Sequence, residues 1–338
     1  EPYQYKLPDT QIAQRPCYPY HDAQLLVVRR DDRALLKSTF IQLSDYLQAG
    51  DLLVFNDTKV IPARLFGTKR STGAAIEVLL LRALELNQWT ALIRPKKRVD
   101  IGTIIDFESG SARVHEVHDG PEVILNFDLE VDFEVFLEES GVMPIPPYIR
   151  KGRADSKDKQ DYQSRFAKTE GSVAAPTASL HFTDELMQQM QAKGIASTFL
   201  TLHVGAASFL PVIDPVTGQL SSPGAEYYRI SDAQSAVLME AKKAKRRVIA
   251  VGTTVARALE SWSGLSGDTG LNPTSLFIQP GHQWRVCDGL VTNFHQPGTT
   301  HLLLVEALLG RSLLDEAYQY ALGSDFRFLS YGDGMCIV

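Results

Sequence analysis

The stretch Val248-Ile249-Ala250-Val251-Gly252-Thr253-Thr254 decides the fold, because one glycine joins an apolar run to the start of a helix. The apolar run predicts a buried strand, and residues 254–262 predict a helix. Exposed amides at a helix start, together with two threonine hydroxyls, suit a carboxylate or a phosphate. A second interpretation is structural: one threonine caps the helix and Gly252 makes the turn. The sequence leaves both interpretations open.

Strands and helices alternate on both sides of this stretch. Apolar runs at Leu52–Phe55, Ser197–His203 and Leu290–Asn293 predict further strands, and Ser231–Ala244 predicts a helix. Such alternation predicts an α/β sheet covered by helices on its faces. The remaining expected elements are strands at Leu276–Ile278 and Phe326–Ser330 and helices at Thr300–Leu309 and Leu314–Leu322.

The segment from about residue 60 to residue 127 has a different pattern. Short apolar runs are separated by turn residues, and helical periodicity is absent. This spacing of strands predicts a small antiparallel β-barrel. We therefore expect a main α/β layered domain formed by residues 1–59 and 132–338, with residues 60–131 inserted as a β-barrel domain.

Composition narrows the class of protein. The 338 residues are 44% hydrophobic and 22% charged, with a net charge of -6. This net charge argues against a protein that binds polyanions non-specifically. One local basic patch would still allow the protein to bind a nucleic acid. Three widely spaced cysteines fit neither a disulfide framework nor a zinc site. With no signal core and no long apolar run, we expect a soluble protein of the cytoplasm.

Three histidines stand where strands give way to loops or helices, namely His181, His203 and His295. A histidine at such a position can act as a general base near neutral pH. Each could instead be a hydrogen-bonded core histidine. No two possible ligands share a helix-face or turn spacing, so we expect no metal.

Charged residues occupy similar positions. Asp57 follows an apolar strand and could neutralise a cation or cap a turn, and the same choice applies to Asp333. The run Arg94-Pro95-Lys96-Lys97-Arg98 is the only dense basic stretch in the β-rich segment. It could hold RNA phosphates or form an ordinary solvated face.

Several common enzyme motifs are missing from the sequence. No Gly-x-Gly-x-x-Gly follows a strand, no Walker loop occurs, and no Gly-x-Ser-x-Gly elbow is present. The sequence therefore argues against dehydrogenases, P-loop NTPases and α/β-hydrolases.

Motifs along nearly the whole chain resemble the S-adenosylmethionine:tRNA ribosyltransferase-isomerase family of queuosine biosynthesis. The matching segments are Tyr5-Lys6-Leu7-Pro8, residues 50–64, Pro146-Pro147-Tyr148-Ile149, residues 171–183, Thr201-Leu202-His203-Val204-Gly205, Gly252-Thr253-Thr254 with Arg257, Thr292-Asn293-Phe294-His295 and Ser330-Tyr331-Gly332-Asp333. So many matches in the same order are specific to the family.

The resemblance implies both a fold and a reaction. The family combines an α/β domain with an inserted β-barrel. Its members transfer and isomerise the ribosyl moiety of S-adenosylmethionine onto 7-aminomethyl-7-deazaguanine at a tRNA wobble position. The products are epoxyqueuosine-tRNA, adenine and methionine. The resemblance therefore implies S-adenosylmethionine as co-substrate, tRNA as partner, no metal and no membrane, and we expect a monomer.

The same resemblance implies roles for individual residues. A base and an acid are expected at His203 and His295, with His181 close by. Carboxylates suit a sulfonium cation, and the candidates are Asp57, Glu226 and Asp333. The co-substrate, including its methionine carboxylate, is expected at Thr177, Gly252, Thr253, Thr254 and Arg257. RNA phosphates are expected at Arg64, Arg94, Lys96 and Arg98.

The chain departs from the family pattern in a few places. Where a histidine-rich loop normally precedes the glutamate matched by Glu226, this chain has Ser222-Pro223-Gly224-Ala225. Val255-Ala256 replaces the usual Ser-Val after Gly252-Thr253-Thr254. The alternative to the enzyme is therefore a catalytically altered family paralogue that binds RNA or a nucleoside.

Overall fold

The computed structural model describes residues 3–118, 120–205, 225–264 and 270–338. By their internal contacts the residues divide into two compact units, one of 1–58, 163–169 and 176–338 and one of 59–162 and 170–175. The insertion expected at 60–131 lies within the second unit. That unit extends further along the chain because α2 (Phe133–Ser140) buries Phe136 and Leu137 in the core of the barrel.

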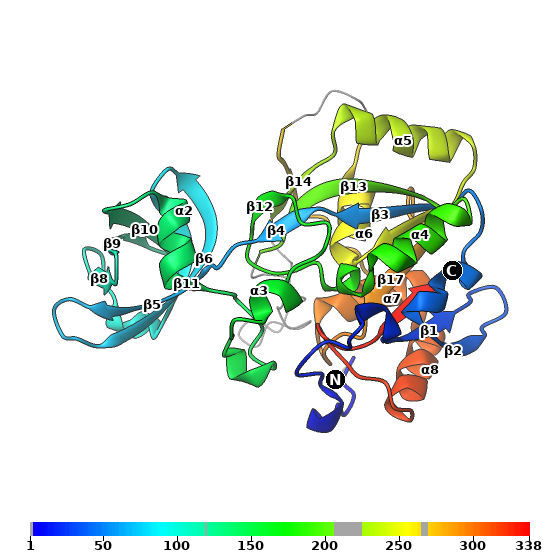
Figure 1. Ribbon diagram of the computed structural model, residues 1–338, viewed down its shortest axis with the longest axis horizontal. Coiled ribbons are helices and arrows are strands. Elements are labelled where there is room, and N and C mark those ends of the chain that lie inside the picture. Colours follow the sequence, from blue (N-terminus) through cyan, green and yellow to red (C-terminus); the bar gives the residue numbers. More distant parts are fainter. Residues whose placement is uncertain (1–2, 119, 206–224, 265–269) are drawn as a thin grey trace. The chain divides into compact units, whose positions relative to one another are not determined.

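A nine-stranded mixed sheet organises the first unit (Figure 1). Its strands, in spatial order, are β16 (Asn272–Thr274), β14 (Glu226–Arg229), β13 (Ala196–His203), β3 (Leu52–Asn56), β15 (Val248–Val251), β17 (Gly289–Asn293), β18 (Gly334–Ile337), β1 (Gln24–Val28) and β2 (Leu35–Thr39). The four central strands β13, β3, β15 and β17 run parallel. On one side, β14 turns back on β13 and β16 turns back on β14. On the other side, β18 turns back on β17, β1 runs parallel to β18, and β2 is antiparallel to β1.

Helices cover both faces of this sheet, as strands that are apolar on both sides require. On β3, Leu53 and Phe55 enter a core with Leu186 and Met190 of α4 (Asp184–Ala192). Successive side chains of a strand alternate in direction, so Leu52 and the other even-numbered residues of β3 face the opposite side. The remaining helices of this unit are α1 (Leu43–Tyr46), α5 (Asp232–Lys243), α6 (Thr253–Ser261), α7 (Thr300–Leu309) and α8 (Arg311–Leu322).

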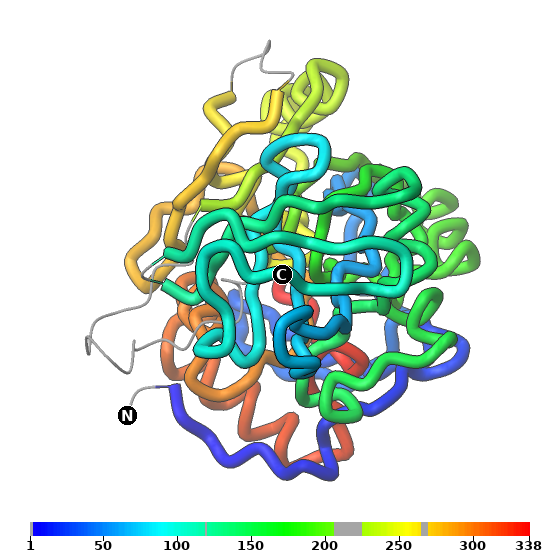
Figure 2. Tube along the Cα trace, turned by 90° about the vertical axis from the view of Figure 1, so that its left-hand side faces the viewer, coloured from blue at the N-terminus to red at the C-terminus, as the bar shows by residue number. Residues whose placement is uncertain are grey.

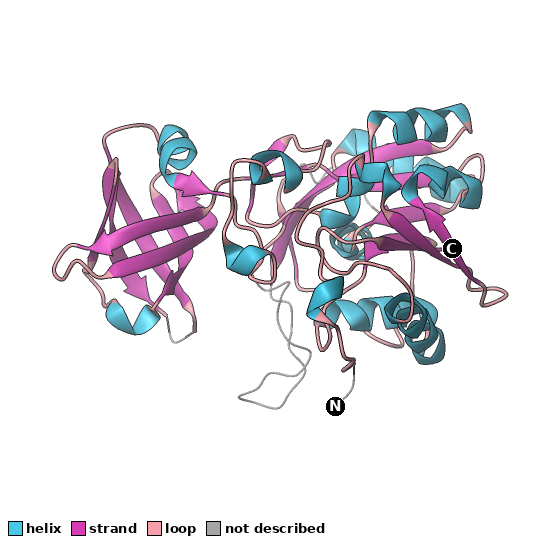
Figure 3. Cartoon of the chain, turned by 60° about the horizontal axis from the view of Figure 1, so that its bottom comes forward, coloured by secondary structure: helices cyan, strands magenta, loops and turns pink. Residues whose placement is uncertain are grey.

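Six antiparallel strands of the second unit close into a barrel, whose trace can be followed in cyan and teal in Figure 2. In ring order they are β5 (Arg64–Lys69), β6 (Ala75–Glu85), β7 (Gln88–Arg94), β10 (Glu122–Leu129), β9 (Gly110–Val117) and β8 (Ile104–Phe107). Pairing of Thr68 with Asp106 completes the ring. Strands make up most of the regular secondary structure of this unit, as Figure 3 shows. The predicted α/β fold with an antiparallel β-barrel is confirmed.

Two predicted strands are wrong. Residues 276–278 have no regular structure, and the edge strand β16 lies just before them. Residues 326–330 form only an isolated bridge, between Ile12 and Phe328, and the final strand is the fully buried β18. In the described ranges, no helix has both the length and the apolar character that crossing a membrane requires.

Candidate active site

Most predicted site residues of the first unit meet at one edge of the mixed sheet. The carboxyl ends of parallel strands share an edge, and the antiparallel strands β14 and β18 begin there. Open α/β sheets bind their ligands at this position. The residues that the topology brings to this edge are Asp57, His203, Glu226, Gly252, Thr253, Thr254, Asn293, His295 and Asp333.

His203, at the end of β13, is held by residues that follow β3. Its Nδ1 lies 2.9 Å from Oγ1 of Thr58, and Oγ1 of Thr201 donates to Oδ1 of Asp57 at 2.6 Å. Partial burial lowers the pKa of His203, while the nearby Asp57 carboxylate opposes that shift. We call Asp57, Thr58, Thr201 and His203 the open cluster. Its half-buried imidazole is neutral at pH 7 and is therefore in the form that accepts a proton.

Asn56 joins the two strands that carry the open cluster. Its Nδ2 donates to the carbonyl of Leu202 at 2.9 Å, and its Oδ1 accepts from the amides of Leu202 and Thr58. A buried amide satisfied at both ends fixes the spacing of neighbouring chain segments. This role of Asn56 depends on contacts between strands that are distant in the sequence, so no local pattern predicts it.

A buried ion pair joins β14 to α6. Nη1 of Arg257 lies 2.9 Å from Oε2 of Glu226, and the two side chains are 9% and 2% exposed. The amide of Gly205 donates to Oε1 of Glu226 at 3.1 Å. Desolvation lowers the pKa of the Arg257 guanidinium, and the Glu226 carboxylate opposes that shift. The predicted loop departure at Ser222–Gly224 lies outside the described residues.

The start of α6 is an uncapped helix end. Its N-cap is Gly252, at φ 100°, which has no side chain to accept from the first amides. Thr253 and Thr254 lie inside the helix, so the structure does not support the interpretation that one of them caps it. The buried Oγ1 of Thr254 has no hydrogen-bond partner among the described residues. A positive φ is the reason for glycine at 252.

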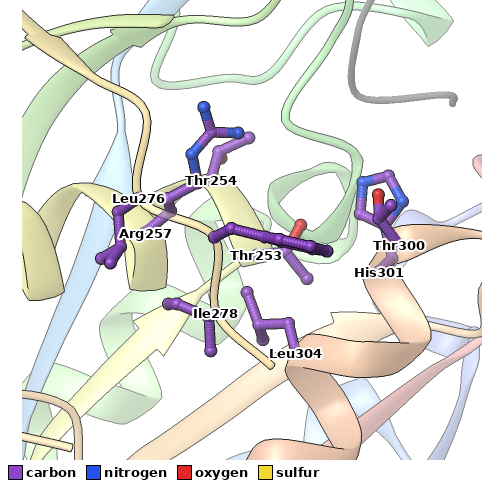
Figure 4. Close-up of a pocket in the computed structure, with 9 residues that line it drawn as sticks. Thr253, Thr254, Arg257, Leu276, Ile278, Thr300, His301 and Leu304 are labelled. Carbon is purple, nitrogen blue, oxygen red and sulfur yellow. The ribbon is translucent and has the colours of Figure 1, made fainter. Parts of the chain in front are cut away.

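A pocket opens beside this helix start, between α6 and α7 (Figure 4). Polar and apolar side chains both line the pocket, so it suits a ligand with both characters. Its lining residues are Thr253, Thr254, Arg257, Leu276, Phe277, Ile278, Thr300, His301 and Leu304.

His301 was missed by the sequence analysis. It lines the pocket and stacks on His295, with ring centroids 4.9 Å apart and planes at 16°. Nε2 of His295 lies 2.9 Å from Oγ1 of Thr292. Desolvation lowers the pKa of His301 to about 4, helped by the charge of Arg257, and lowers that of His295 well below 6.5. Both rings are therefore neutral at pH 7.

A second group of predicted residues is packed into the fold, and we call His181, Asn293 and Asp333 the closed cluster. His181 stacks on Phe40 with centroids 4.0 Å apart, and burial lowers its pKa to about 3. Nδ2 of Asn293 lies 3.4 Å from Nε2 of His181. Thr177 belongs with this group, because its Oγ1 donates to Oδ1 of Asn293 at 2.8 Å.

The Asp333 carboxylate, only 1% exposed, is occupied by main-chain donors. It accepts from the amide of Gln24 at 2.9 Å and from that of Arg327 at 2.6 Å. Burial raises its pKa despite these donors. These donors hold the Asp333 carboxylate at the junction of β1 and β18, and its role toward substrate stays a prediction.

The four predicted phosphate-binding cations lie in the second unit and differ in exposure. Arg94 and Arg98 are exposed, whereas Nζ of Lys96 donates to the carbonyl of His118 at 2.7 Å. Arg64 is half-buried and donates to the carbonyl of Gly152 at 2.6 Å. Arg64 is thus engaged in internal contacts. Over the described ranges, no group of three or more His, Cys, Asp or Glu side chains is arranged to hold a metal ion.

The parallel strands of the mixed sheet gather histidines, threonines and a buried ion pair beside a pocket at their carboxyl edge. This arrangement is typical of the ligand sites of α/β enzymes. The model of a family described as queuosine biosynthesis protein matches residues 1–337. The chain belongs to this family, and the resemblance in the sequence is confirmed.

Known relatives match over nearly their full length. An S-adenosylmethionine:tRNA ribosyltransferase-isomerase of Desulforamulus reducens is 44% identical, covering 99% of this chain and 98% of the relative. One of Halothermothrix orenii is 41% identical, covering 100% and 99%. The crystal structure of an S-adenosylmethionine tRNA ribosyltransferase from Thermotoga maritima is 32% identical, with a TM-score of 0.57 and 99% of each chain covered.

Proposed function

We propose that this chain is an S-adenosylmethionine:tRNA ribosyltransferase-isomerase. It transfers and isomerises the ribosyl moiety of S-adenosylmethionine onto 7-aminomethyl-7-deazaguanine at the tRNA wobble position. The products are epoxyqueuosine-tRNA, adenine and methionine. The observation that carries the proposal is the match to relatives of this name at 41–44% identity over 99–100% of the chain.

His203 is the proposed general base. The reaction requires removal of a proton beside the sulfonium, and a neutral imidazole accepts such a proton. Thr58 holds Nδ1 of His203, which directs Nε2 toward a ligand at the sheet edge. The Asp57 carboxylate then stabilises the imidazolium that forms, as its influence on the His203 pKa supports.

The sulfonium cation is assigned to Asp57 in preference to Glu226 or Asp333. Arg257 already neutralises Glu226 at 2.9 Å, and main-chain amides surround Asp333. Asp57 is bonded through Oδ1 to an uncharged partner, Thr201. Among the residues that the structure describes, Asp57 has no ion-pair partner, so its negative charge favours a nearby cation.

The methionine carboxylate is assigned to the start of α6. Free amides at a helix start and the positive end of its dipole attract an anion. The Thr254 hydroxyl, which has no hydrogen-bond partner among the described residues, is a donor that such a ligand would satisfy. Thr253 and Arg257 line the same pocket. Gly252 permits the turn that exposes these groups.

His295 and His301 are assigned to the adenine leaving group. Their lowered pKa values oppose a role as an imidazolium acid in the free enzyme. Neutral imidazoles still donate and accept hydrogen bonds, and so they can stabilise adenine as it departs.

The partner is a tRNA, held in part by Arg94, Lys96 and Arg98. An unpaired wobble base lies in a loop, where it can be turned into a pocket with little loss of pairing. The chain works as a monomer in the cytoplasm, without a metal. Light scattering on the purified protein, with and without tRNA, tests the monomer.

One assay tests the reaction. The protein is incubated with S-adenosylmethionine and tRNA bearing the aminomethyl precursor base, and released adenine is measured against modified tRNA. Equal amounts of the two are expected. If the Desulforamulus reducens relative releases adenine under the same conditions and this chain does not, the proposal is wrong. Binding of tRNA without adenine release would favour the altered paralogue.

A further inference from the structure

One exposed aromatic ring stands among cations on the outside of the barrel. Phe66 of β5 is 60% exposed. It lies opposite Glu77 of β6, and Glu77 lies opposite Arg94 of β7. Residues directly paired across strands point to the same face, so the three side chains form one row. We call this row and its surroundings the Phe66 face.

Arg64 neutralises the carboxylate in that row. It lies two residues before Phe66 and so points to the same face. Its Nε is 3.2 Å from Oε1 of Glu77, and its other nitrogens donate to the carbonyls of Gly152 and Ile145 at 2.6 and 3.2 Å. Arg64 thereby connects the turn at residues 150–152 to the Phe66 face.

That turn has an unusual backbone. Arg150, Lys151 and Gly152 have φ values of 44°, 56° and 74°, a left-handed region that L-residues disfavour. Asp158 holds it, accepting from Nη2 of Arg150 at 2.6 and 2.5 Å. Strain of this kind persists where surrounding contacts impose it, and it concentrates at functional sites. The result is a fixed turn with exposed cations at Lys151 and Arg153.

The basic run after β7 is fixed as well. Nζ of Lys69, near the end of β5, donates to the carbonyl of Arg98 at 2.7 Å. Lys96 is tied to the carbonyl of His118, while Lys97 and Arg98 remain exposed. The cations therefore stand on rigid backbone, which lowers the entropy lost on binding.

We propose that the Phe66 face is an RNA-docking surface, on which Phe66 stacks with an unpaired base while Arg94, Lys151 and Arg153 contact the flanking phosphates. An aromatic platform beside cations is the combination that single-stranded RNA requires, because its bases stack and its phosphates need neutralising. The surface deepens the proposed function, since tRNA is its expected occupant.

The test compares four variants of the full chain, of which Arg94→Ala removes one cation. Phe66→Ala removes the ring, Phe66→Trp retains a stacking surface, and Leu86→Ala removes an apolar side chain that is 88% exposed, between β6 and β7. Affinity for the precursor tRNA is measured by fluorescence anisotropy over a series of salt concentrations. Thermal melts check that each variant is folded.

The proposal predicts that Phe66→Ala weakens binding on the order of tenfold, with an unchanged salt slope because no charge is lost. Phe66→Trp and Leu86→Ala should bind like the unaltered chain. Arg94→Ala should weaken binding and reduce the salt slope by about one. The proposal would be overturned if Phe66→Ala bound tRNA with unaltered affinity, or if Phe66→Ala and Phe66→Trp lost equal affinity for tRNA. Absence of adenine release by the unaltered chain would instead overturn the proposed function.

Discussion

The open and closed clusters hold the same kinds of residue at the same edge of the sheet, yet their surroundings differ. In the open cluster His203 is half-buried, with one nitrogen on Thr58. In the closed cluster the ring of His181 is stacked on Phe40, and the carboxylate of Asp333 is surrounded by main-chain donors. Position at a strand end therefore does not define a catalytic residue; access to a ligand also matters.

The largest effect is expected from the open cluster. His203→Ala removes the proposed base, and adenine release should fall by about 10²- to 10⁴-fold. The melting temperature should change little, because the side chain is only half-buried. Single-turnover adenine release measures the rate, and a thermal melt of the same sample measures the melting temperature. Activity within a few-fold of the unaltered chain would remove His203 from the mechanism.

Asp333 should behave in the opposite way. Asp333→Ala leaves the buried amides of Gln24 and Arg327 without their acceptor, which destabilises the fold by about 2–4 kcal/mol. Urea unfolding measures this loss, and adenine release per folded molecule should be largely retained. If Asp333→Ala kept full stability but lost adenine release, Asp333 would instead take part in the reaction, as proposed for the open cluster.

The pH dependence of stability separates the clusters further. The folded pKa of His181 is about 3, below the unfolded value of 6.5. Between these values only the unfolded chain binds this proton, so stability is complete above pH 6.5 and falls as pH drops, by about 1.4 kcal/mol per pH unit. His181→Gln should reduce the slope of unfolding free energy against pH by about one proton. An identical slope in both proteins would contradict the buried, neutral histidine.

The smallest effect concerns two threonines. Thr254→Val removes a hydroxyl that has no partner in the described part of the chain, so the KM for S-adenosylmethionine should rise about five- to tenfold at unchanged stability. Thr177→Val removes a hydroxyl already bonded to Asn293 and should lower stability by about 1 kcal/mol without changing this KM. Steady-state kinetics and thermal melts of the pair provide the comparison. If Thr177→Val raised the KM and Thr254→Val lowered the stability, Thr177 would be the ligand contact and Thr254 the structural residue.

Much of the site could be predicted because strand ends are visible in the sequence. Apolar runs followed by Asp57, His203, Gly252 and His295 indicated where ligands meet the sheet, and family motifs supported them. His301 could not be found in this way. It stands in an apolar helix, and only tertiary packing shows that its ring lines the pocket.

The sequence could not separate the two clusters for a similar reason. The donors around Asp333 come from Gln24 and Arg327, and the ring against His181 comes from Phe40. Gln24 is 309 residues from Asp333 along the chain, and Phe40 is likewise far from His181 and lies on another element. Local sequence patterns therefore contain no sign of these contacts. Burial is a property of the assembled fold, and it decides which polar groups remain available.

The pH dependence of kcat/KM for adenine release tests the central claim most directly, because it reports the ionisation of the base in the free enzyme. The lowered pKa of His203 predicts an acid limb with a midpoint below pH 6.5, with activity lost as pH falls through it. This limb should vanish in His203→Ala and persist in His181→Gln. A limb that persists without His203 and disappears without His181 would contradict the assignment of catalysis to the open cluster.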